Sequence, residues 1–310
     1  MQQQHTLHVL LGAGGAIATE LSKLITADGH PVRLVSRRPV TTDHSLITWQ
    51  QADLLRADQT LAATRGATVI YLCAGLRYDT KVWQEQWPVI MRNVITATEA
   101  TGARLIFFDN IYAYGLVDGP ITEATPYRPS SAKGEVRARI AGELLQAVAA
   151  GRLRASIARA PDFYGIYGDN SFLDSMVINK LKQGDRALWV GNPARLHNFI
   201  YVPDAARATY TLAQHPHSDN QVWHLPTPPP ISGKDLLALV AATFRVPERH
   251  FTINKAMLRL LGLFDPVVKN SVEMYYQYDR DYHFDSTKFE RTFGVQPTPY
   301  REALEEISQR

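Results

Sequence analysis

A cluster of glycines near the start of the chain carries the clearest chemical signal of the sequence. It follows a short apolar run, residues 9–11, and precedes an amphipathic stretch. Glycine allows a turn too tight for a side chain and lets a pyrophosphate approach the backbone. The helix after the turn would direct its free N–H groups and the positive end of its dipole at that anion. This context predicts a dinucleotide site, and the expected contacts are Gly12, Gly14, Gly15, Ala16 and Ile17.

Two consecutive arginines end the next apolar run, residues 32–36. A small polar residue followed by arginine suits the 2′-phosphate of NADP, whereas NAD-selective sites usually place a carboxylate there to accept the ribose hydroxyls. A solvated surface is the alternative for an arginine pair in a loop. Because the pair follows a predicted strand, we expect NADP(H) in preference to NAD(H), held by Ser36, Arg37 and Arg38.

A second pair of basic residues lies one helical turn apart. Lys133 and Arg137 would share one face of a helix that the spacing of apolar residues predicts over 133–150. Two like charges at this spacing repel mildly unless an anion or a hydroxyl-rich ligand lies between them. The alternative is a solvated helix face, and the residues alone leave both interpretations open.

The elements that must position these residues alternate between strands and helices. Strands are predicted over 9–11, 32–36, 47–49, 67–75, 104–109 and 155–160, with a return strand over 221–225. This order predicts an α/β fold, a Rossmann-like doubly wound parallel sheet with ligands beyond the carboxyl ends of its strands. We expect the cofactor domain to comprise 1–165 and 200–225. A smaller, interleaved C-terminal substrate subdomain would comprise 166–199 and 226–310, with a helix capped by Ser232 and a mostly helical remainder.

Composition excludes several classes of protein. The 310-residue chain has a formal net charge of +3 with both signs interspersed, unlike the basic stripe that nucleic acid binding needs. No apolar run reaches the roughly 18 residues that cross a bilayer, and residues 1–5 lack the regions of a signal peptide. The single cysteine, Cys73, fits a reducing compartment. We expect a cytoplasmic protein with a small-molecule substrate and neither nucleic acid nor a membrane as partner; His215 and His217 lack a third ligand nearby, so we expect no metal.

A series of short motifs then occurs in a characteristic order. Through these motifs the chain resembles the NAD-dependent epimerase/dehydratase group of the extended short-chain dehydrogenase/reductase superfamily. The resemblance runs nearly from end to end. The motifs are Gly12-x-x-Gly15-x-x-Ala18, Asp53-Leu54, Leu72-Cys73-Ala74, Tyr114-Gly115, Arg159-x-x-Asp162-x-Tyr164-Gly165 and the run from His197 to Ala206. The resemblance implies an adenine-side role for Asp53 and further cofactor contacts from Leu54, Cys73, Ala74, Gly75, Lys133, Pro161 and Phe163.

The chain departs from the family pattern at the catalytic residues. Members carry a Ser or Thr after the fifth strand and a Tyr-x-x-x-Lys pair on the next helix, where tyrosine moves the proton. Counting from the neighbouring motifs places Asn110 at the hydroxyl position, Lys133 at the tyrosine and Arg137 at the lysine. A register anchored on a later glutamate would place Glu135 and Arg139 there instead. Neither register restores the tyrosine.

One hypothesis retains an enzyme with substituted catalytic residues. Lys133 would transfer the proton or clamp a carbonyl oxygen, since burial and the nearby Arg137 would lower its pKa. Arg137 would hold ribose hydroxyls, Asn110 would hydrogen-bond the substrate oxygen, and Tyr112 is a reserve acid. The expected function is NADP(H)-dependent oxidoreductase or epimerase/dehydratase-like hydride transfer on a polar small molecule, such as a sugar or a hydroxylated carbonyl compound.

The other hypothesis is a catalytically degenerate NAD(P)-binding sensor or regulatory protein, motivated by the missing pair. Against it, downstream aromatic residues are expected to line a substrate cleft, among them Trp189, Trp223, Tyr276 and Tyr278. Relatives pair through the helices expected over 82–101 and 133–150. The sequence leaves open whether this chain also forms a homodimer.

Overall fold

The computed structural model describes residues 6–165 and 171–309. Its centre is a seven-stranded sheet in the order β11-β6-β5-β4-β1-β2-β3, and all of its strand pairs are parallel. The order reverses beside β1, because β2 and β3 lie on one side of it and β4, β5 and β6 on the other. The strands are β1 (His8–Leu11), β2 (Val32–Ser36), β3 (Ile47–Gln51), β4 (Val69–Leu72), β5 (Arg104–Asn110), β6 (Arg154–Ala160) and β11 (Gln221–His224).

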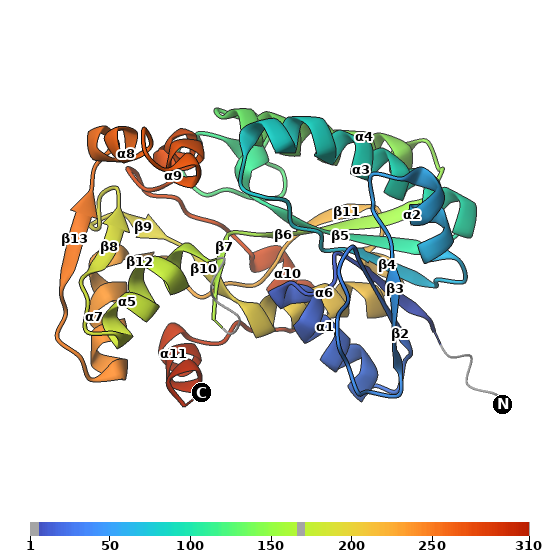
Figure 1. Cartoon of the computed structure of the whole chain (residues 1–310), viewed down its shortest axis with the longest axis horizontal. Coiled ribbons are helices and arrows are strands. Elements are labelled where there is room, and N and C mark those ends of the chain that lie inside the picture. The colour runs from blue at the N-terminus through green and yellow to red at the C-terminus, as the bar shows by residue number, and fades with distance from the viewer. Residues whose placement is uncertain (1–5, 166–170, 310) are drawn as a thin grey trace.

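Helices cover both faces of this sheet (Figure 1). One face packs against α2 (Ala57–Thr64), α3 (Thr80–Thr101) and α4 (Ala132–Ala149) through the larger of the apolar clusters. The other face packs against α1 (Ala16–Ala27) and α6 (Val202–Gln214). The predicted α/β fold with a doubly wound parallel sheet is therefore confirmed.

A second lobe forms around the parallel pair β8 (Ala187–Val190) and β13 (His250–Ile253). The π-helical turn Asp174–Ile178 leads into α5 (Asn179–Lys182), and with α7 (Gly233–Phe244) and α11 (Tyr300–Ser308) these helices surround a separate apolar cluster. Ser232 caps α7 as expected, since its Oγ accepts a hydrogen bond from Asp235 N at 3.1 Å. The lobe is completed by α8 (Lys255–Leu261), α9 (Pro266–Ser271) and the 3-10 helix Val272–Gln277.

Short strand pairs connect the two lobes. β7 (Asp162–Tyr164) pairs with β10 (Phe199–Tyr201), and β9 (Leu196–His197) pairs with β12 (Ile231–Ser232). The chain then returns to the sheet, because α10 (Thr287–Phe293) places the fully buried Phe289 in the cluster around α1 and α6. The C-terminal segment thus contributes to both lobes.

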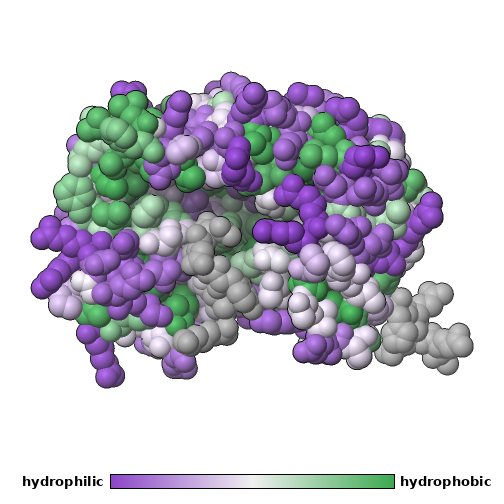
Figure 2. Space-filling view, in the orientation of Figure 1, coloured by the Kyte–Doolittle hydropathy of each residue, from purple (hydrophilic) through white to green (hydrophobic). Residues whose placement is uncertain are grey.

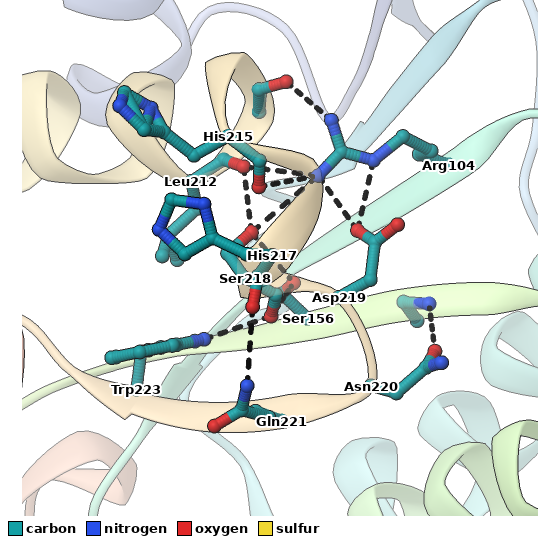
Figure 3. Close-up of polar contacts among 12 residues, drawn as sticks. Arg104, Ser156, Leu212, His215, His217, Ser218, Asp219, Asn220, Gln221 and Trp223 are labelled. Carbon is teal, nitrogen blue, oxygen red and sulfur yellow. Dashed lines mark hydrogen bonds and ion pairs between the residues drawn. The ribbon is translucent and has the colours of Figure 1, made fainter. Parts of the chain in front are cut away.

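Arg104 fixes the amino-terminal end of the sheet, opposite the glycine turn. Its guanidinium forms an ion pair with Asp219 at 2.6 Å and donates to the carbonyls of Leu212, Ala213 and His215 at the end of α6 (Figure 3). A cation at a helix carboxyl terminus satisfies carbonyls that have no partner within the helix. Arg104 is therefore a structural residue that joins β5 to α6.

Some local expectations were wrong. The remainder after α7 is mostly helical, as expected, but residues 250–253 form a strand that was not expected, β13, whose pairing partner lies about sixty residues earlier in β8. Trp189 and Trp223 are each 2% exposed and pack in the cores of the two lobes, which contradicts the cleft role expected for Trp223. Trp189 also lines a small pocket together with His197 and Tyr278. The range 166–170 of the expected substrate subdomain and residues 1–5 lie outside the described residues.

Candidate functional site

The glycine turn lies at the carboxyl end of β1, where the strand order reverses. Gly12 has φ +98°, and a Cβ there would lie 2.3 Å from the Ala74 Cα that follows β4. Only glycine allows this close approach between the two strand ends. Gly15 is the N-cap of α1 and provides no side-chain cap, and no acidic residue follows in the first turn. The backbone N–H groups of Ala16 and Ile17 therefore begin a helix suited to an anion.

The loop after β2 lies beside this turn. A Cβ on Gly14 would lie 3.7 Å from the Val40 side chain, which places the two loops in contact. Ser36 Oγ donates to the Arg38 carbonyl at 2.6 Å and accepts from Trp49 Nε1 at 3.0 Å. The side chains of Arg37 and Arg38 are exposed. Arg37 and Arg38 therefore lie in the loop that adjoins the glycine turn, and their role toward a phosphate stays a prediction.

The other predicted cofactor contacts follow the carboxyl ends of neighbouring strands. Asp53 Oδ1 accepts from Leu55 N at 3.1 Å, so this carboxylate shapes the turn in which it lies, and Leu54 is buried. Cys73 and Ala74 are half-buried after β4 and precede the exposed Gly75, and burial raises the pKa of the Cys73 thiol to about 12. Pro161 and Phe163 follow β6. The structure brings these residues to one edge of the sheet, and their cofactor roles stay predictions.

Lys133 is fully buried, so the solvated-face alternative is wrong for it. Its ammonium donates to Glu273 Oε1 at 2.7 Å, to Thr80 Oγ1 at 2.9 Å and to the Asn270 carbonyl at 2.6 Å. An ammonium has three N–H groups, and each has an acceptor within the chain. Burial lowers the pKa of Lys133 from its ordinary value and the Glu273 carboxylate opposes this shift. Lys133 thereby joins α4 to the segment after α9.

Arg137 is also buried and pairs with a different carboxylate. Its Nε donates to Asp109 Oδ1 at 2.6 Å, while Arg159 Nη2 donates to Asp109 Oδ2 at 2.7 Å. The guanidinium lies over the Trp87 ring, with Cζ 4.4 Å from the ring centroid. Burial lowers the pKa of Arg137, and Asp109 opposes this shift. The two like charges on α4 are therefore balanced by separate carboxylates of the chain itself.

A group of titratable side chains converges where β4, β5 and β6 end. We call Tyr78, Tyr112, Asp162, His197 and Tyr278 the tyrosine cluster. The Tyr278 hydroxyl donates to Asp162 Oδ2, and His197 Nε2 lies 3.3 Å from the same oxygen. The His197 and Tyr278 rings are stacked with centroids 5.1 Å apart. Tyr78 and Tyr112 lie beside this group, and burial together with the Asp162 charge raises the pKa of both phenols.

The environment of the tyrosine cluster separates proton donors from an acceptor. Burial raises the pKa of Asp162, but the contact with His197 and the hydrogen bond from Tyr278 outweigh it, so the net shift is downward. Burial and the Asp162 charge raise the pKa of Tyr278, and burial with nearby Tyr78 and Asp162 raises that of Tyr112. At neutral pH the phenols are therefore protonated and the carboxylate is ionised. Such a pair of opposed environments suits general acid–base chemistry.

Asn110 is the last residue of β5 and lies opposite Ala160, the last residue of β6. Tyr112 follows Asn110 by two residues, and Asp162 follows Ala160 by two residues. Its side-chain oxygen accepts from Tyr112 N at 3.1 Å and its backbone N–H donates to Asp109 Oδ1 at 2.8 Å. The amide is half-buried at the carboxyl edge. Asn110 thus connects the tyrosine cluster to the buried ion pairs.

The surface is recessed between the two lobes on the face drawn in Figure 2. A separate hollow lined by Thr122, Glu123, Gln221 and Lys288 lies at the outer edge of β11, away from the glycine turn. Within residues 6–165 and 171–309, no group of three His, Cys, Asp or Glu side chains could hold a metal ion. In the same part of the chain, no helix has the length and apolar composition to cross a membrane.

Sequence reasoning missed the acidic partners of the site, Asp109, Glu273 and Asp162, and the contact made by Tyr278. The sequence did distinguish Asp162, because this residue occupies the position at which the resembled motif has asparagine. Glu273 had none, since it lies 140 residues from the lysine that it binds.

Residues 8–225 match the model of the NAD dependent epimerase/dehydratase family. The chain belongs to this family, and its sheet order and glycine turn are those of a Rossmann-like nucleotide-binding protein. No curated protein matches the chain in sequence.

Solved structures with the same fold are similar over nearly the whole chain. dTDP-glucose 4,6-dehydratase from Streptomyces venezuelae, with NAD and TYD bound, has a TM-score of 0.80 at 15% identity and covers 98% of this chain and 96% of its own. UDP-glucose 4-epimerase from Thermotoga maritima, with UDP-glucose, has a TM-score of 0.80 at 14% identity and covers 98% of each chain. MoeE5, in complex with UDP-glucose and NAD, has a TM-score of 0.77 at 19% identity and covers 98% and 97%.

Proposed function

We propose that the chain binds a nicotinamide dinucleotide at the glycine turn and acts as an NADP(H)-dependent oxidoreductase or epimerase/dehydratase-like enzyme on a polar small molecule. The observation that carries the proposal is the contact of Gly12 with Ala74 at the reversal of strand order. Ligands of open α/β sheets bind at this point, outside the carboxyl ends of the strands. A side chain at Gly12 would occupy the space between the strand ends.

Sugar nucleotides are the substrate class to test first. The dehydratase and epimerase neighbours are named for dTDP-glucose and UDP-glucose, and the family is defined by epimerases and dehydratases. A sugar carries hydroxyl groups that the phenols and carboxylate of the tyrosine cluster can hydrogen-bond.

When bound, the cofactor would supply or accept a hydride. Asn110 would orient the substrate oxygen, and Tyr112 would hold the proton at its phenol oxygen for transfer to it. Asp162 would accept hydrogen bonds from the substrate or receive a proton through Tyr278. Lys133 and Arg137 would set the position of α4 against the site through Glu273 and Asp109.

The proton-transfer role is tested by removing one oxygen at a time. We expect Tyr112→Phe and Asp162→Asn to lower turnover about 100-fold or more while nucleotide affinity changes little. Tyr210→Phe is the matched control, because Tyr210 lies far along α6 and its hydroxyl donates to Asp28. Turnover of Tyr112→Phe equal to that of Tyr210→Phe would remove Tyr112 from the proposal.

Lys133 has two proposed roles, and one pair of variants separates them. If its ammonium transfers the proton, Lys133→Ala abolishes turnover and Glu273→Gln leaves it largely intact. If Lys133 positions α4, both changes lower thermal stability and turnover together, because each breaks the 2.7 Å ion pair.

NADP(H) preference is proposed on the exposed Arg37 and Arg38, which belong to the loop whose Val40 adjoins Gly14. Arginine recognises a phosphate through paired hydrogen bonds. We expect Arg37→Ala to weaken NADPH binding about tenfold and to leave NADH binding unchanged, with the exposed Arg56→Ala as the control. Equal affinity of the wild type for both nucleotides would overturn the preference.

A sensor without catalysis is the second candidate. The observation that favours it is the complete set of protein acceptors around Lys133 Nζ, which leaves none of its N–H groups for a substrate. A sensor would bind the nucleotide with the same affinity and turn over no carbonyl compound or sugar nucleotide in a broad panel.

A further inference from the structure

A group of large apolar side chains is exposed at one end of the second lobe. We call Leu260, Leu261, Leu263, Phe264 and Val267 the apolar tip. Their exposed fractions are 61%, 46%, 75%, 84% and 56%. They occupy the end of α8, the turn after it and the start of α9, which stand at an outer corner of the molecule (Figure 1), and Figure 2 shows an apolar surface at that corner.

Local structure holds the apolar tip outward. Gly262 begins the turn, and a Cβ there would lie 2.9 Å from Lys269 Cα, so the turn packs closely on α9. The Asp265 side chain accepts from Val267 N at 2.7 Å and Val268 N at 3.2 Å, which caps α9. The two helices therefore present Leu263 and Phe264 at the turn between them. Contiguous exposed apolar side chains on a folded chain mark an interaction site.

The charges around the apolar tip are mainly basic. Lys255 and Arg259 on α8 and Lys269 on α9 are exposed, whereas the nearby Asp265 is engaged as a helix cap. An apolar projection with lysine and arginine at its margin is the pattern of interfacial membrane-binding segments, which insert apolar side chains and pair their cations with anionic headgroups.

A second copy of the chain fits this surface less well. A twofold interface brings the same patch together from both copies. The interface would then collect Arg259 and Lys269 from both copies, and an excess of like charge in an interface opposes association. An anionic bilayer surface neutralises these charges and buries the apolar side chains at the same time.

We propose that the apolar tip docks the protein on the surface of a membrane that contains anionic lipids. This peripheral contact departs from the sequence-based expectation of no membrane partner. The lack of a membrane-crossing helix in the described part of the chain concerns spans and not surface contacts. α9 also carries Asn270, whose carbonyl accepts from Lys133, so the docking face adjoins an element that holds the proposed site. The proposal stands independently of the reaction.

The test is sedimentation of the full chain with vesicles of phosphatidylcholine alone or with about one third phosphatidylglycerol. We expect binding to the mixed vesicles that weakens as salt rises, and little binding to neutral vesicles. Leu263→Ser/Phe264→Ser should lower the partition coefficient at least about tenfold. Arg259→Gln/Lys269→Gln should lower it by a similar factor at low salt. Leu116→Ser/Leu196→Ser removes two exposed leucines elsewhere and should change nothing.

Three outcomes would overturn the proposal. One is wild-type protein that stays in the supernatant with both kinds of vesicle. Another is equal loss of binding in the Leu116→Ser/Leu196→Ser control. The last is a wild-type dimer, measured by light scattering, that Leu263→Ser/Phe264→Ser converts to a monomer, since the apolar tip would then be a self-interface. Thermal melts of each variant ensure that the compared proteins are folded.

Discussion

Replacing Asp109 by asparagine tests the ion pairs beneath the proposed site. The Asp109 side chain is fully buried between Arg137 and Arg159, and one of its oxygens also accepts from Asn110 N. Asparagine has nearly the same shape but no charge. The substitution therefore leaves two buried guanidinium groups without a counter-charge at almost unchanged volume.

The expected cost follows from breaking a buried pair on one side. Removing one partner of such a pair costs about 3–5 kcal/mol, because an uncompensated charge stays in the interior. For a chain of 310 residues, a loss of 3 kcal/mol corresponds to a fall in melting temperature of roughly 4–5 °C. The assay is urea and thermal unfolding followed by circular dichroism at neutral pH.

Two further variants control the interpretation. Asp58→Asn removes an exposed carboxylate whose ion pair with Arg56 spans 3.5 Å, and it should change stability by less than about 0.5 kcal/mol. Asp109→Asn/Arg137→Gln removes one of the two unbalanced cations and should recover part of the loss. Asp109→Asn with the stability of Asp58→Asn would refute the reasoning.

The remaining predictions concern other parts of the fold. Gly12→Ala should abolish nucleotide binding and lower stability, whereas Gly142→Ala, on an open helix face, should raise stability by about 0.5–1 kcal/mol; equal effects would contradict the close approach. Burial and His30 lower the pKa of His8 from 6.5 to about 4, so the folded state keeps it neutral, and stability should fall by about 3 kcal/mol as the pH drops from 6.5 to 4. Unfolding of His8→Gln across that range should show a shallower fall, and an unchanged slope would reject the assignment. Arg104→Met should lower stability by about 3 kcal/mol or more, because it leaves Asp219 buried and unpaired, and a near-neutral result in the same urea assay would contradict its structural role.

Local sequence patterns predicted the sheet and the glycine turn because their determinants are neighbours in the chain. Apolar runs give parallel strands, and the glycines give the close approach of backbone to backbone. Ser232 was likewise correctly predicted as a helix cap, since a cap is defined by the residues that follow it. β13 escaped prediction because its four residues become a strand only through pairing with β8.

The site was only partly predictable because its charges are balanced over long separations. Lys133 and Arg137 were expected to face a ligand or solvent, yet each binds a carboxylate of the chain. Tyr278 and Asp162 are 116 residues apart and meet only when the two lobes pack together. No spacing rule within one helix or strand reports such contacts.

The most direct test of the central claim is the binding of nicotinamide dinucleotide to the wild-type chain. NADPH and NADH would be titrated in parallel while nicotinamide fluorescence is followed, with Gly12→Ala as the control. The account predicts saturable binding of NADPH at micromolar concentrations, weaker binding of NADH, and no binding to Gly12→Ala. Absence of saturable binding of both nucleotides to the wild type would contradict it, because the glycine turn would then be a structural connection alone.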